Sequence, residues 1–261
     1  MGSAAVQGQL WGAEARDWAE LQEQNTLPLY GAALAAGRVR RGTRLLDAGC
    51  GAGLVALLAA LRGAEVAAVD AAPALLAIAR ERLPEADVRE ADLEALPYAD
   101  AAFDAVLAVQ SAFYAADMAA ALGELARVAR PGGRVVATGW GPADRCAYAR
   151  VVGALGPLLP PPPPGASGPF ALAAPGAWEA LFDGAGLRVV GRGEVACPFD
   201  FDDAEAAWRA HASVGPVRRA IEVAGEAVVR AATAAVDRAH AQPDGTIRYE
   251  NVFVWVAGVR P

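Results

Sequence analysis

Short apolar runs alternate along this chain with longer segments whose apolar positions recur at every third or fourth residue. We predict strands in the runs RLLDAG, EVAAVD, ADVREADL, AAFDAVLAVQ, RVVATGW, LRVVGRGEVACPF and TIRYENVFVWVAGV. Helical spacing predicts helices between them, at 73–82, 117–130 and 175–186. Strands that alternate with helices are typical of a largely parallel sheet covered by helices, so the pattern predicts an α/β fold.

The glycine-rich stretch after the first predicted strand is the strongest local signal. The run Leu45-Leu-Asp-Ala-Gly-Cys-Gly-Ala-Gly53 breaks at three alternating glycines and then continues as the apolar helical segment LVALLAALRG. Glycine lacks a Cβ, so a ligand can approach the backbone closely at such a turn. A strand, a tight turn and a helix N-terminus predict one half of a nucleotide site.

The acidic residues around this turn indicate what kind of nucleotide would bind. Asp70 ends the second predicted strand, 21 residues after Gly49, where a carboxylate suits two ribose hydroxyls. The spacing is G-x-G-x-G rather than G-x-G-x-x-G, and neither Arg nor Lys lies in the turn to meet a phosphate. Asp47 would repel phosphate but suits a ligand with an ammonium group and a sulfonium. A NAD-binding domain or a purely structural strand–turn–helix unit are the alternatives.

The segment LLDAGCGAG resembles motif I of the class I S-adenosylmethionine-dependent methyltransferases. The resemblance continues through VAAVDAA, ADLEALPYADAAFDAVLAVQSAFY and LARVARPGGRVVATGW, over roughly residues 40–141. It implies a Rossmann-like sheet of seven strands in the order 3-2-1-4-5-7-6, with the last strand antiparallel and helices on both faces. It also implies S-adenosylmethionine as cofactor and S-adenosylhomocysteine as its product.

The cofactor-binding residues that we expect combine the glycine turn with positions implied by the resemblance. Asp92 would meet the adenine amino group as a hydrogen-bond acceptor, with a backbone contact from Leu93 beside it. The alternative for Asp92 is a turn or helix cap. The full expected set is Trp11, Trp18, Asp47, Gly49, Cys50, Gly51, Gly53, Asp70, Ala71, Asp92, Leu93 and Gln110.

The resemblance to small-molecule methyltransferases implies that residues 1–42 form an N-terminal helical lid over the cofactor. Helices are expected at Asp17 to Leu21 and after Pro28. Trp11 and Trp18 would cover the methionine part of the cofactor, because a sulfonium is attracted to an aromatic face. The alternative is that both side chains only pack this segment against the core.

The remaining chain is predicted to divide into a methyltransferase core, residues 43–199 and 244–261, and a helical insert, residues 200–243. Two helices are expected in the insert, with the apolar positions of the second at helical spacing from Val217 to Ala235. The insert would cover the substrate pocket or form a dimer contact. The proline-rich stretch 157–169 is expected to be a stiff, extended connector.

A general base is required only if the methyl acceptor must lose a proton before it attacks. In-line transfer from an activated sulfonium otherwise depends on alignment and on exclusion of water. The chain has two histidines, His211 and His240, both in the insert. His211 is the candidate base, with a surface or capping role as the alternative; weaker candidates are Tyr30, Tyr114 and Glu205.

Composition narrows the range of partners and locations. The net charge is −7, every basic residue is Arg, and no basic stripe indicates nucleic-acid binding. Three dispersed cysteines give neither a disulfide framework nor metal-ligand spacing, which favours a reducing cytoplasm and predicts no metal. No apolar run has the length of a membrane span, and the N-terminus lacks the pattern of a signal peptide.

The sequence therefore favours a cytoplasmic bacterial methyltransferase that acts on a small molecule, as a monomer or homodimer. We expect a secondary metabolite as substrate and oxygen as the acceptor atom, with nitrogen and carbon as alternatives. A second hypothesis is an enzyme that binds S-adenosylmethionine but catalyses a reaction other than methylation. A third is a non-catalytic binding module built on the proline-rich stretch and the insert helices.

Overall fold

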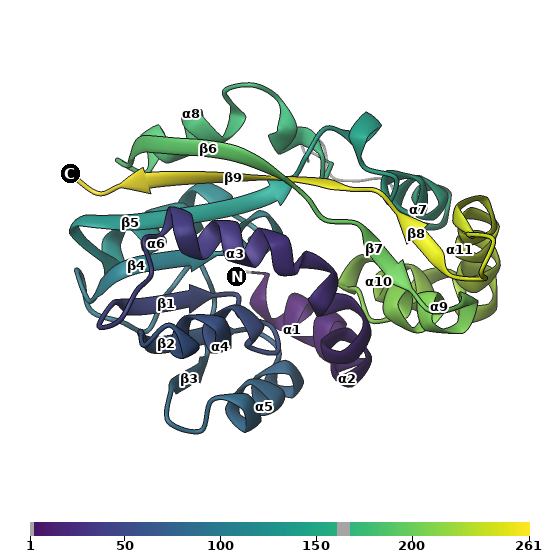
Figure 1. Ribbon diagram of the computed structural model, residues 1–261, viewed down its shortest axis with the longest axis horizontal. Helices are drawn as coiled ribbons and strands as arrows, with labels where there is room; N and C mark the ends of the chain where they lie inside the picture. Colours follow the sequence, from purple (N-terminus) through teal and green to yellow (C-terminus); the bar gives the residue numbers. More distant parts are fainter. Residues whose placement is uncertain (1–2, 161–167) are drawn as a thin grey trace.

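A seven-stranded sheet forms the centre of the molecule (Figure 1). The computed structural model describes residues 3–160 and 168–261. The strand order is β3-β2-β1-β4-β5-β9-β6, and only β9 runs antiparallel to its neighbours. With β9 as the seventh strand of this sheet, the predicted order and the antiparallel last strand are confirmed. The strands are β1 (Arg44–Ala48), β2 (Glu65–Asp70), β3 (Asp87–Glu90), β4 (Phe103–Ala108), β5 (Ala129–Trp140), β6 (Arg188–Ala196) and β9 (Val252–Val259).

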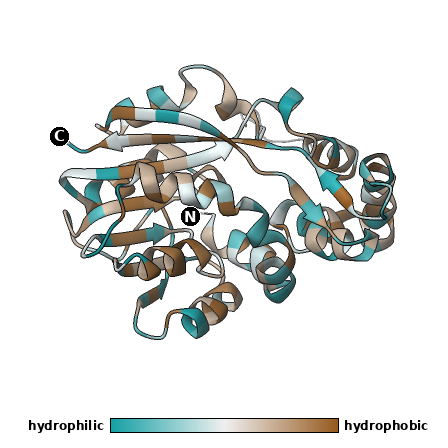
Figure 2. Cartoon of the chain, in the orientation of Figure 1, coloured by the Kyte–Doolittle hydropathy of each residue, from teal (hydrophilic) through white to brown (hydrophobic). Residues whose placement is uncertain are grey.

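Helices cover both faces of the sheet because its inner strands carry apolar side chains on both faces. On β1 and β4, Leu45 and Leu107 belong to one buried cluster, whereas Leu46 and Val106 belong to another. The first cluster packs under α3 (Leu27–Ala36) and α4 (Leu54–Leu61), and the second under α6 (Met118–Val128) and α8 (Ala177–Gly184). Helix α5 (Pro73–Arg82) packs on β2 and β3. The hydropathy colouring shows α4 as largely apolar (Figure 2).

Helices α5, α6 and α8 begin or end at residue types that are common at helix ends. Pro73 occupies the first turn of α5, where its missing N–H leaves no hydrogen bond unmade. Asp117 caps α6 by accepting a hydrogen bond from the Ala120 N–H at 3.0 Å. Gly186 follows α8 with a φ of +71°, the left-handed conformation that commonly ends helices.

The insert contains three helices rather than the two predicted. They are α9 (Ala204–Ala212), α10 (Gly215–Ala224) and α11 (Glu226–His240). The apolar spacing from Val217 to Ala235 suggested one continuous helix, but Gly225 has a φ of +87° and separates α10 from α11. That conformation is open mainly to glycine, so the spacing alone could not reveal the break.

The predicted closing strand 246–259 is also divided. Its first part, β8 (Ile247–Tyr249), pairs with β7 (Phe199–Phe201) in a separate two-stranded sheet. Only β9 enters the central sheet, between β5 and β6. The β7–β8 pair carries the chain out to the insert helices and α7 (Ala149–Leu155), which Figure 1 shows beyond the carboxyl ends of the parallel strands.

The N-terminal segment lies at the same end of the sheet. Helix α1 (Ala4–Gly12), which the sequence did not indicate, contacts α5 and α10. Helix α2 (Ala15–Asp17) continues into a π-helical turn, Trp18–Gln22, that contacts α9. Further short 3-10 turns are Glu23–Thr26, Ala112–Tyr114, Ala143–Arg145, Gly156–Leu158 and Ala171–Ala173. The N-terminal segment therefore bridges the sheet helices and the insert. The division of the chain into lid, core and insert stays a prediction.

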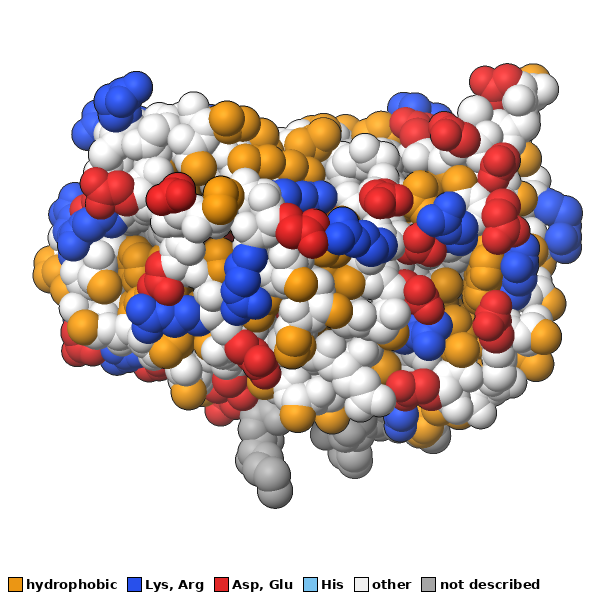
Figure 3. Space-filling model, turned by 90° about the horizontal axis from the view of Figure 1, so that it is seen from below, with side chains coloured by type: hydrophobic (Ala, Val, Ile, Leu, Met, Phe, Trp, Pro, Cys, Tyr) orange, Lys and Arg blue, Asp and Glu red, His pale blue; other side chains and the backbone are white. Residues whose placement is uncertain are grey.

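Surface and composition findings bear on the expected partners. Among the described residues, no helix combines the length and apolar character that crossing a membrane requires. Within the same ranges, no group of three or more His, Cys, Asp or Glu side chains could hold a metal ion. Acidic and basic side chains are interspersed on the face shown in Figure 3.

Residues 161–167 of the proline-rich stretch lie outside the described residues, so its expected extended conformation is not tested.

Candidate cofactor site

One large cavity lies at the carboxyl ends of β1, β2 and β4, with a volume of about 1190 Å³ including its open mouth. Open α/β sheets bind ligands at this edge. Eleven of the twelve expected cofactor residues line this cavity: Trp11, Trp18, Asp47, Gly49, Cys50, Gly51, Asp70, Ala71, Asp92, Leu93 and Gln110. Gly53 does not line it, and instead precedes α4 with a φ of +85°. The structure thus brings together residues from the N-terminal segment and from the ends of four strands, β1, β2, β3 and β4.

The glycine turn is shaped by close packing as well as by backbone conformation. Gly49 has a φ of +78°, and a Cβ on it would lie 2.2 Å from the Cβ of Ser111. Gly51 has a φ of +55°, and a Cβ there would lie 3.0 Å from the Trp18 ring. The Gly49 N–H donates a hydrogen bond to the Val69 carbonyl at 2.8 Å, which ties the turn to β2. Both glycines are therefore needed to keep the turn thin between β4 and the tryptophan.

Asp70 stabilises the turn from the tip of β2. Its carboxylate accepts hydrogen bonds from the N–H groups of Gly51 at 2.8 Å and Ala72 at 2.9 Å. Burial raises the pKa of Asp70, while these backbone hydrogen bonds act in the opposite direction. Each carboxylate oxygen accepts one protein hydrogen bond in the structure and has further acceptor capacity toward the cavity. The side chain thus supports the turn and remains suited to ligand hydroxyls.

Asp47 is a buried carboxyl group without a hydrogen-bond partner. Its exposure is 1%, and neither side-chain oxygen has a partner among the described residues. Burial raises its pKa to about 8, the nearby backbone N–H of Ala56 acts in the opposite direction, and the neighbouring carboxylates of Glu23 and Asp70 add to the increase. Buried polar groups are nearly always hydrogen-bonded in folded proteins. An unpaired carboxyl in a cavity wall therefore indicates a place for a cationic or hydrogen-bond-donating ligand group.

Gln22 is a second unpaired polar group in the wall, and no sequence pattern indicated it. Its side chain is buried, and its Oε1 atom has no partner within the described chain. The next residue, Glu23, points the other way: it accepts a hydrogen bond from the Leu54 N–H at the start of α4 and pairs with Arg82 at 2.5 Å. This anchor holds the π-helical turn so that Gln22 and Trp18 face the cavity.

Asp92 and Leu93 line the cavity after β3. Asp92 accepts a hydrogen bond from the Glu94 N–H at 3.0 Å, so the turn role that we considered as an alternative is present. A carboxylate has acceptor capacity beyond one such bond. The turn role and a ligand role are therefore compatible for Asp92.

Gln110 is held in an unusual conformation at the end of β4. It has a φ of +57°, which is rare for a residue with a side chain. Its backbone N–H and its side-chain Nε2 both donate to the Thr138 hydroxyl, at 2.9 Å and 3.0 Å. Next to it, the Ser111 hydroxyl donates to the Ala48 carbonyl at 2.6 Å. Strained backbone that neighbouring contacts hold in place is frequent at functional sites.

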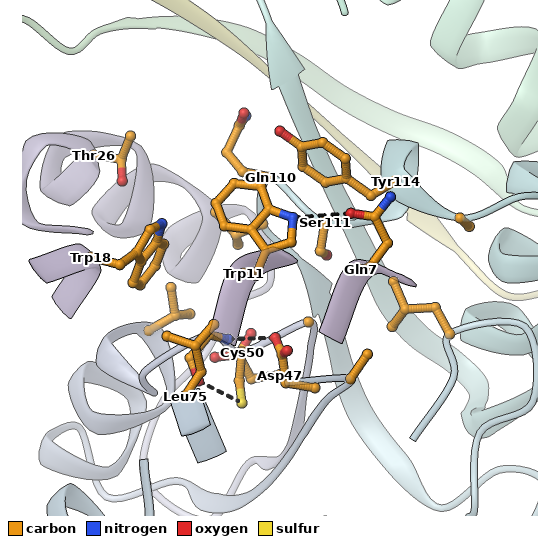
Figure 4. A pocket seen from close by; sticks show the side chains of 18 of the residues that line it. Gln7, Trp11, Trp18, Thr26, Asp47, Cys50, Leu75, Gln110, Ser111 and Tyr114 are labelled. Atoms are coloured by element: carbon orange, nitrogen blue, oxygen red, sulfur yellow. Dashed lines mark hydrogen bonds between the residues drawn. The ribbon is translucent and has the colours of Figure 1, made fainter. Parts of the chain in front are cut away.

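Trp11 and Trp18 project from the N-terminal segment into the cavity wall (Figure 4). The Trp11 Nε1–H donates to the Gln7 side chain at 3.1 Å, and its ring meets Tyr114 edge-on at 5.2 Å. The two tryptophan rings are themselves 6.3 Å apart and nearly perpendicular. Both residues thus pack against protein and face the cavity, and their role in covering the cofactor stays a prediction.

The expectation that His211 faces the substrate pocket is wrong. His211 is fully buried on α9 and does not line the cavity. Its Nδ1 lies 3.1 Å from the Tyr148 hydroxyl, and its Nε2 lies 2.9 Å from Asp237. The Tyr249 hydroxyl donates to the same Asp237 oxygen at 2.6 Å. Sequence spacing placed His211 on a helix but could not show that this helix turns its histidine toward α11.

The weaker base candidates differ in their positions. Tyr30 and Tyr114 line the cavity, but burial raises the pKa of both hydroxyls, so each is a hydrogen-bond donor rather than a base. Glu205 is exposed and pairs with Arg230, away from the cavity. His240 stacks on Tyr249 with ring centroids 4.4 Å apart, also outside the cavity wall.

Three aromatic residues at one end of the cavity were missed by the sequence reasoning. Trp140, Phe199 and Phe253 line it and pack on one another, and we call them the aromatic wall. They come from β5, β7 and β9, so no local motif contains them. The only sequence signal was an aromatic residue near the end of each of these strands.

The residues of the cavity fit S-adenosylmethionine better than a dinucleotide. Among the described lining residues, three are Asp and none is Arg or His. The chain has no Lys. A pyrophosphate would lie unpaired among carboxyl groups, whereas a ligand with an ammonium and a sulfonium would supply the missing partner of Asp47. The glycine turn and the orphaned carboxyl therefore match this cofactor.

Comparison with known proteins agrees with this reading of the fold. Residues 46–137 match the family model described as a methyltransferase domain. The uncharacterized protein Rv1403c of Mycobacterium tuberculosis is 35% identical over 167 residues, which cover 62% of this chain and 60% of that protein. The demethylmenaquinone methyltransferase of Thermus thermophilus is 44% identical over 114 residues, covering 41% and 52% of the two chains. The chain thus spans less than two thirds of the length of these relatives.

A solved structure extends the similarity beyond the matched segment. The structure of geranyl diphosphate methyltransferase in complex with SAM has a TM-score of 0.55 and 19% identity, and the match covers 96% of this chain and 91% of the other. Identity at this level shows the fold alone. Residues 46–137 thus match a methyltransferase domain, and the chain shares its fold with a solved methyltransferase in complex with SAM.

Proposed function

We propose that this protein is a methyltransferase that transfers a methyl group from S-adenosylmethionine to a small molecule. The observation that carries the proposal is Asp47, a buried carboxyl with two unpartnered oxygens beside the glycine turn. Its cavity has no cationic side chain among the described lining residues. A cofactor with a net positive charge suits such a cavity, and a phosphate-rich one does not.

The proposed binding mode assigns each part of the cofactor to residues of this chain. The methionine tail lies over the glycine turn with its ammonium group toward Asp47, and Gln22 offers further hydrogen bonds to the tail. Asp70 accepts from the ribose hydroxyls, and Asp92 accepts from the adenine amino group beside Ala71 and Leu93. Trp11, Trp18 and Gln110 cover the reacting centre and exclude water from it.

The cofactor supplies a methyl group that the sulfonium charge already activates. The protein's task is to align the acceptor with that methyl group and to keep the site dry. We keep oxygen as the first choice of acceptor atom, with nitrogen and carbon as alternatives. Because His211 is absent from the cavity wall, the acceptor must react without a histidine base. An amine meets this condition because its lone pair attacks before its proton leaves, and a neutral phenol or enol meets it when its proton passes to water as the methyl group is transferred.

A labelled-methyl assay tests this proposal. Purified protein is incubated with S-adenosylmethionine that carries a deuterated methyl group and with a panel of small phenols, enols and amines. We expect one panel member to gain a single labelled methyl group by mass spectrometry. Asp70→Asn should lower the rate at least about tenfold, because charge-assisted hydrogen bonds are the stronger ones. The exposed Asp202→Asn should leave the rate unchanged.

The same assay separates the alternative hypotheses. Conversion of a panel member to another compound without gain of the labelled methyl group would favour an S-adenosylmethionine-dependent reaction other than methylation. Binding of the cofactor with no product from any panel would favour the non-catalytic module. The cytoplasmic location, the role in secondary metabolism and the monomeric or homodimeric state stay predictions of the sequence.

A further inference from the structure

We infer that the far end of the cavity is an acceptor subsite for an uncharged, largely apolar molecule with a flat ring, and that it rejects anions. The inference rests on the proposed function, because it assigns one end of the cavity to the cofactor. It specifies a substrate class for the other end. The aromatic wall and the charge distribution of the cavity carry the argument.

The two ends of the cavity lie over different parts of the sheet. The glycine turn, Asp47 and Asp70 lie at the tips of β1 and β2. Trp140 and Phe253 lie on β5 and β9, on the other side of β4. Gln110 at the end of β4 stands between the two regions. A cofactor that occupies the tips of β1 and β2 therefore leaves the far end of the cavity to its reaction partner, with Trp140 as the partly exposed member of the aromatic wall and Phe199 and Phe253 buried behind its surface.

The rings of the aromatic wall are held in position by packing on one another and on Tyr148. Trp140 and Phe253 are directly opposite each other in the β5–β9 pairing, with ring centroids 4.5 Å apart. Phe199 lies 5.9 Å from Trp140 and 6.0 Å from Phe253. Behind the wall, Tyr148 stacks on Trp140 at 5.7 Å with the ring planes within 7°. Aromatic faces that are held in position favour flat apolar ligands, since little freedom is lost on binding.

The charges of the cavity exclude an anionic acceptor. Its described lining residues include three Asp side chains and neither Arg nor His. A carboxylate or phosphate on the acceptor would be buried without a cationic partner, which is strongly unfavourable. The uncharged polar side chains in the cavity wall include those of Gln110, Tyr114 and Thr26. They suit a hydroxyl, carbonyl or amine on an otherwise apolar ring.

His211 has a place in this arrangement as a positioning residue. It contacts the Tyr148 hydroxyl, and Tyr148 supports the Trp140 ring from behind. The histidine therefore acts on the subsite through two aromatic residues and touches neither the cavity nor its contents. This explains how a buried insert residue connects to the acceptor end without being a base.

A pair of probes that share one ring system but differ in charge tests the inference. Protein loaded with S-adenosylhomocysteine is titrated in a calorimeter, near neutral pH, with 2-naphthol and separately with 2-naphthoate. We expect 2-naphthol to bind at least about 100-fold more tightly, because the naphthoate charge would be buried unpaired. Phe253→Leu should weaken 2-naphthol binding by roughly two- to tenfold through loss of the ring. Its affinity for S-adenosylhomocysteine, which also reports on folding, should not change.

A variant that adds a positive charge to the cavity tests the inference through a gain of binding rather than a loss. Val214 lines the cavity, and Val214→Arg would introduce a cation into its wall. We expect this variant to bind 2-naphthoate about tenfold or more tightly than the unaltered protein does, through a charge-assisted contact. The neutral variant Val214→Gln should bind 2-naphthoate no more tightly than the unaltered protein does.

The outcomes separate this inference from the proposed function. If the protein does not bind S-adenosylhomocysteine, the proposed function fails first. If it binds S-adenosylhomocysteine but takes 2-naphthoate as tightly as 2-naphthol, or takes neither, the subsite inference is overturned while the cofactor site stands. Unchanged 2-naphthol affinity in Phe253→Leu would show that the aromatic wall is not the binding surface.

Discussion

At the scale of single residues, the candidate site combines groups that the fold leaves unsatisfied or strained. Asp47 is a buried acid without a partner, and Gln110 is a non-glycine residue at positive φ. Neither feature helps the free protein to fold, because each is unfavourable in isolation. Both lie in the same cavity wall. Their coincidence supports a ligand-binding role for that wall more strongly than either feature alone.

Asp47 should make the stability of the free protein depend on pH. Its pKa rises from 3.8 in the unfolded chain to about 8 in the folded protein. Between about pH 4 and pH 8 the folded state keeps a proton that the unfolded state has lost, so stability falls as pH rises through this window. Urea unfolding of Asp47→Asn across this range should give a flatter profile, with higher stability than the unaltered protein near pH 8.

The control for this experiment is Asp202→Asn, which changes an exposed carboxyl of the same type. It should leave the slope of the pH profile as it is. If Asp47→Asn shows the same slope as the unaltered protein, Asp47 does not hold its proton in the folded state. The assignment of Asp47 as an orphaned buried acid would then be incorrect.

A side chain should be tolerated less well at Gly49 in the glycine turn than at Gly42, which has a similar backbone conformation. Gly42 has a φ of +76° with open space around it, whereas a Cβ on Gly49 would collide with Ser111. Gly42→Ala should lower the free energy of unfolding by about 1–2 kcal/mol through backbone strain alone. Gly49→Ala should lower it by about a further 1–3 kcal/mol. Equal losses in denaturant unfolding would mean that the turn can move away from β4.

At the scale of elements, the insert is joined to the core through polar contacts as well as apolar packing. Asp237 on α11 accepts from Tyr249 on β8 and contacts His211 on α9. The same cluster reaches Tyr148 at the start of α7. One buried carboxyl therefore links helices and a strand that are distant in sequence.

Removal of this carboxyl should loosen the insert. Asp237→Ala leaves the Tyr249 hydroxyl buried without its acceptor and removes the partner of the His211 Nε2. We expect a loss of about 2 kcal/mol or more in the free energy of unfolding, measured with denaturant. Asp202→Ala, at an exposed site before α9, should stay within about 0.5 kcal/mol. A similarly small effect for Asp237→Ala would rule out the cluster as the anchor of the insert.

Three helical segments show which elements could be predicted from the sequence and which could not. The helix at 73–82 was predicted to the residue, because Pro73 and the local apolar spacing mark it. The break at Gly225 was missed, since a glycine within a regular spacing does not reveal its φ angle. Helix α1 was missed because residues 4–12 contain two glycines and lack a capping side chain.

The same distinction applies to the candidate site. The cavity residues of the glycine turn follow from a local spacing, whereas the aromatic wall is assembled from three strands that meet only in the folded chain. His211 shows the limit most clearly. Its helix was predicted, but the direction of its ring depends on contacts with Asp237 and Tyr148.

At the scale of the whole molecule, the N-terminal segment is attached to both the core and the insert by ion pairs. Glu14 and Asp17 pair with Arg218 and Arg209 of the insert. On the core side, an exposed pair joins Arg16 to Glu81, and a buried one joins Glu23 to Arg82. Exposed pairs contribute little to stability, so the Glu23–Arg82 pair should dominate this attachment.

A comparison of two arginine variants tests which pair holds the segment. Arg82→Gln leaves Glu23, whose side chain is 1% exposed, without its cation, and should lower stability by about 3 kcal/mol. Arg16→Gln removes only the exposed pair and should cost less than about 1 kcal/mol. Hydrogen exchange should also accelerate over residues 15–26 in Arg82→Gln. If the two variants behave alike, the attachment does not depend on the buried pair.

The central claim is that a positively charged methyl donor, and not a nicotinamide dinucleotide, occupies the cavity beside Asp47. Calorimetric titration of the purified protein with S-adenosylhomocysteine, S-adenosylmethionine and NAD tests it directly. We expect S-adenosylhomocysteine and S-adenosylmethionine to bind saturably at one site per chain, and NAD not to bind. The affinity for both sulfur compounds should be markedly weaker in Asp70→Asn. Binding of NAD together with no heat from either sulfur compound would contradict it.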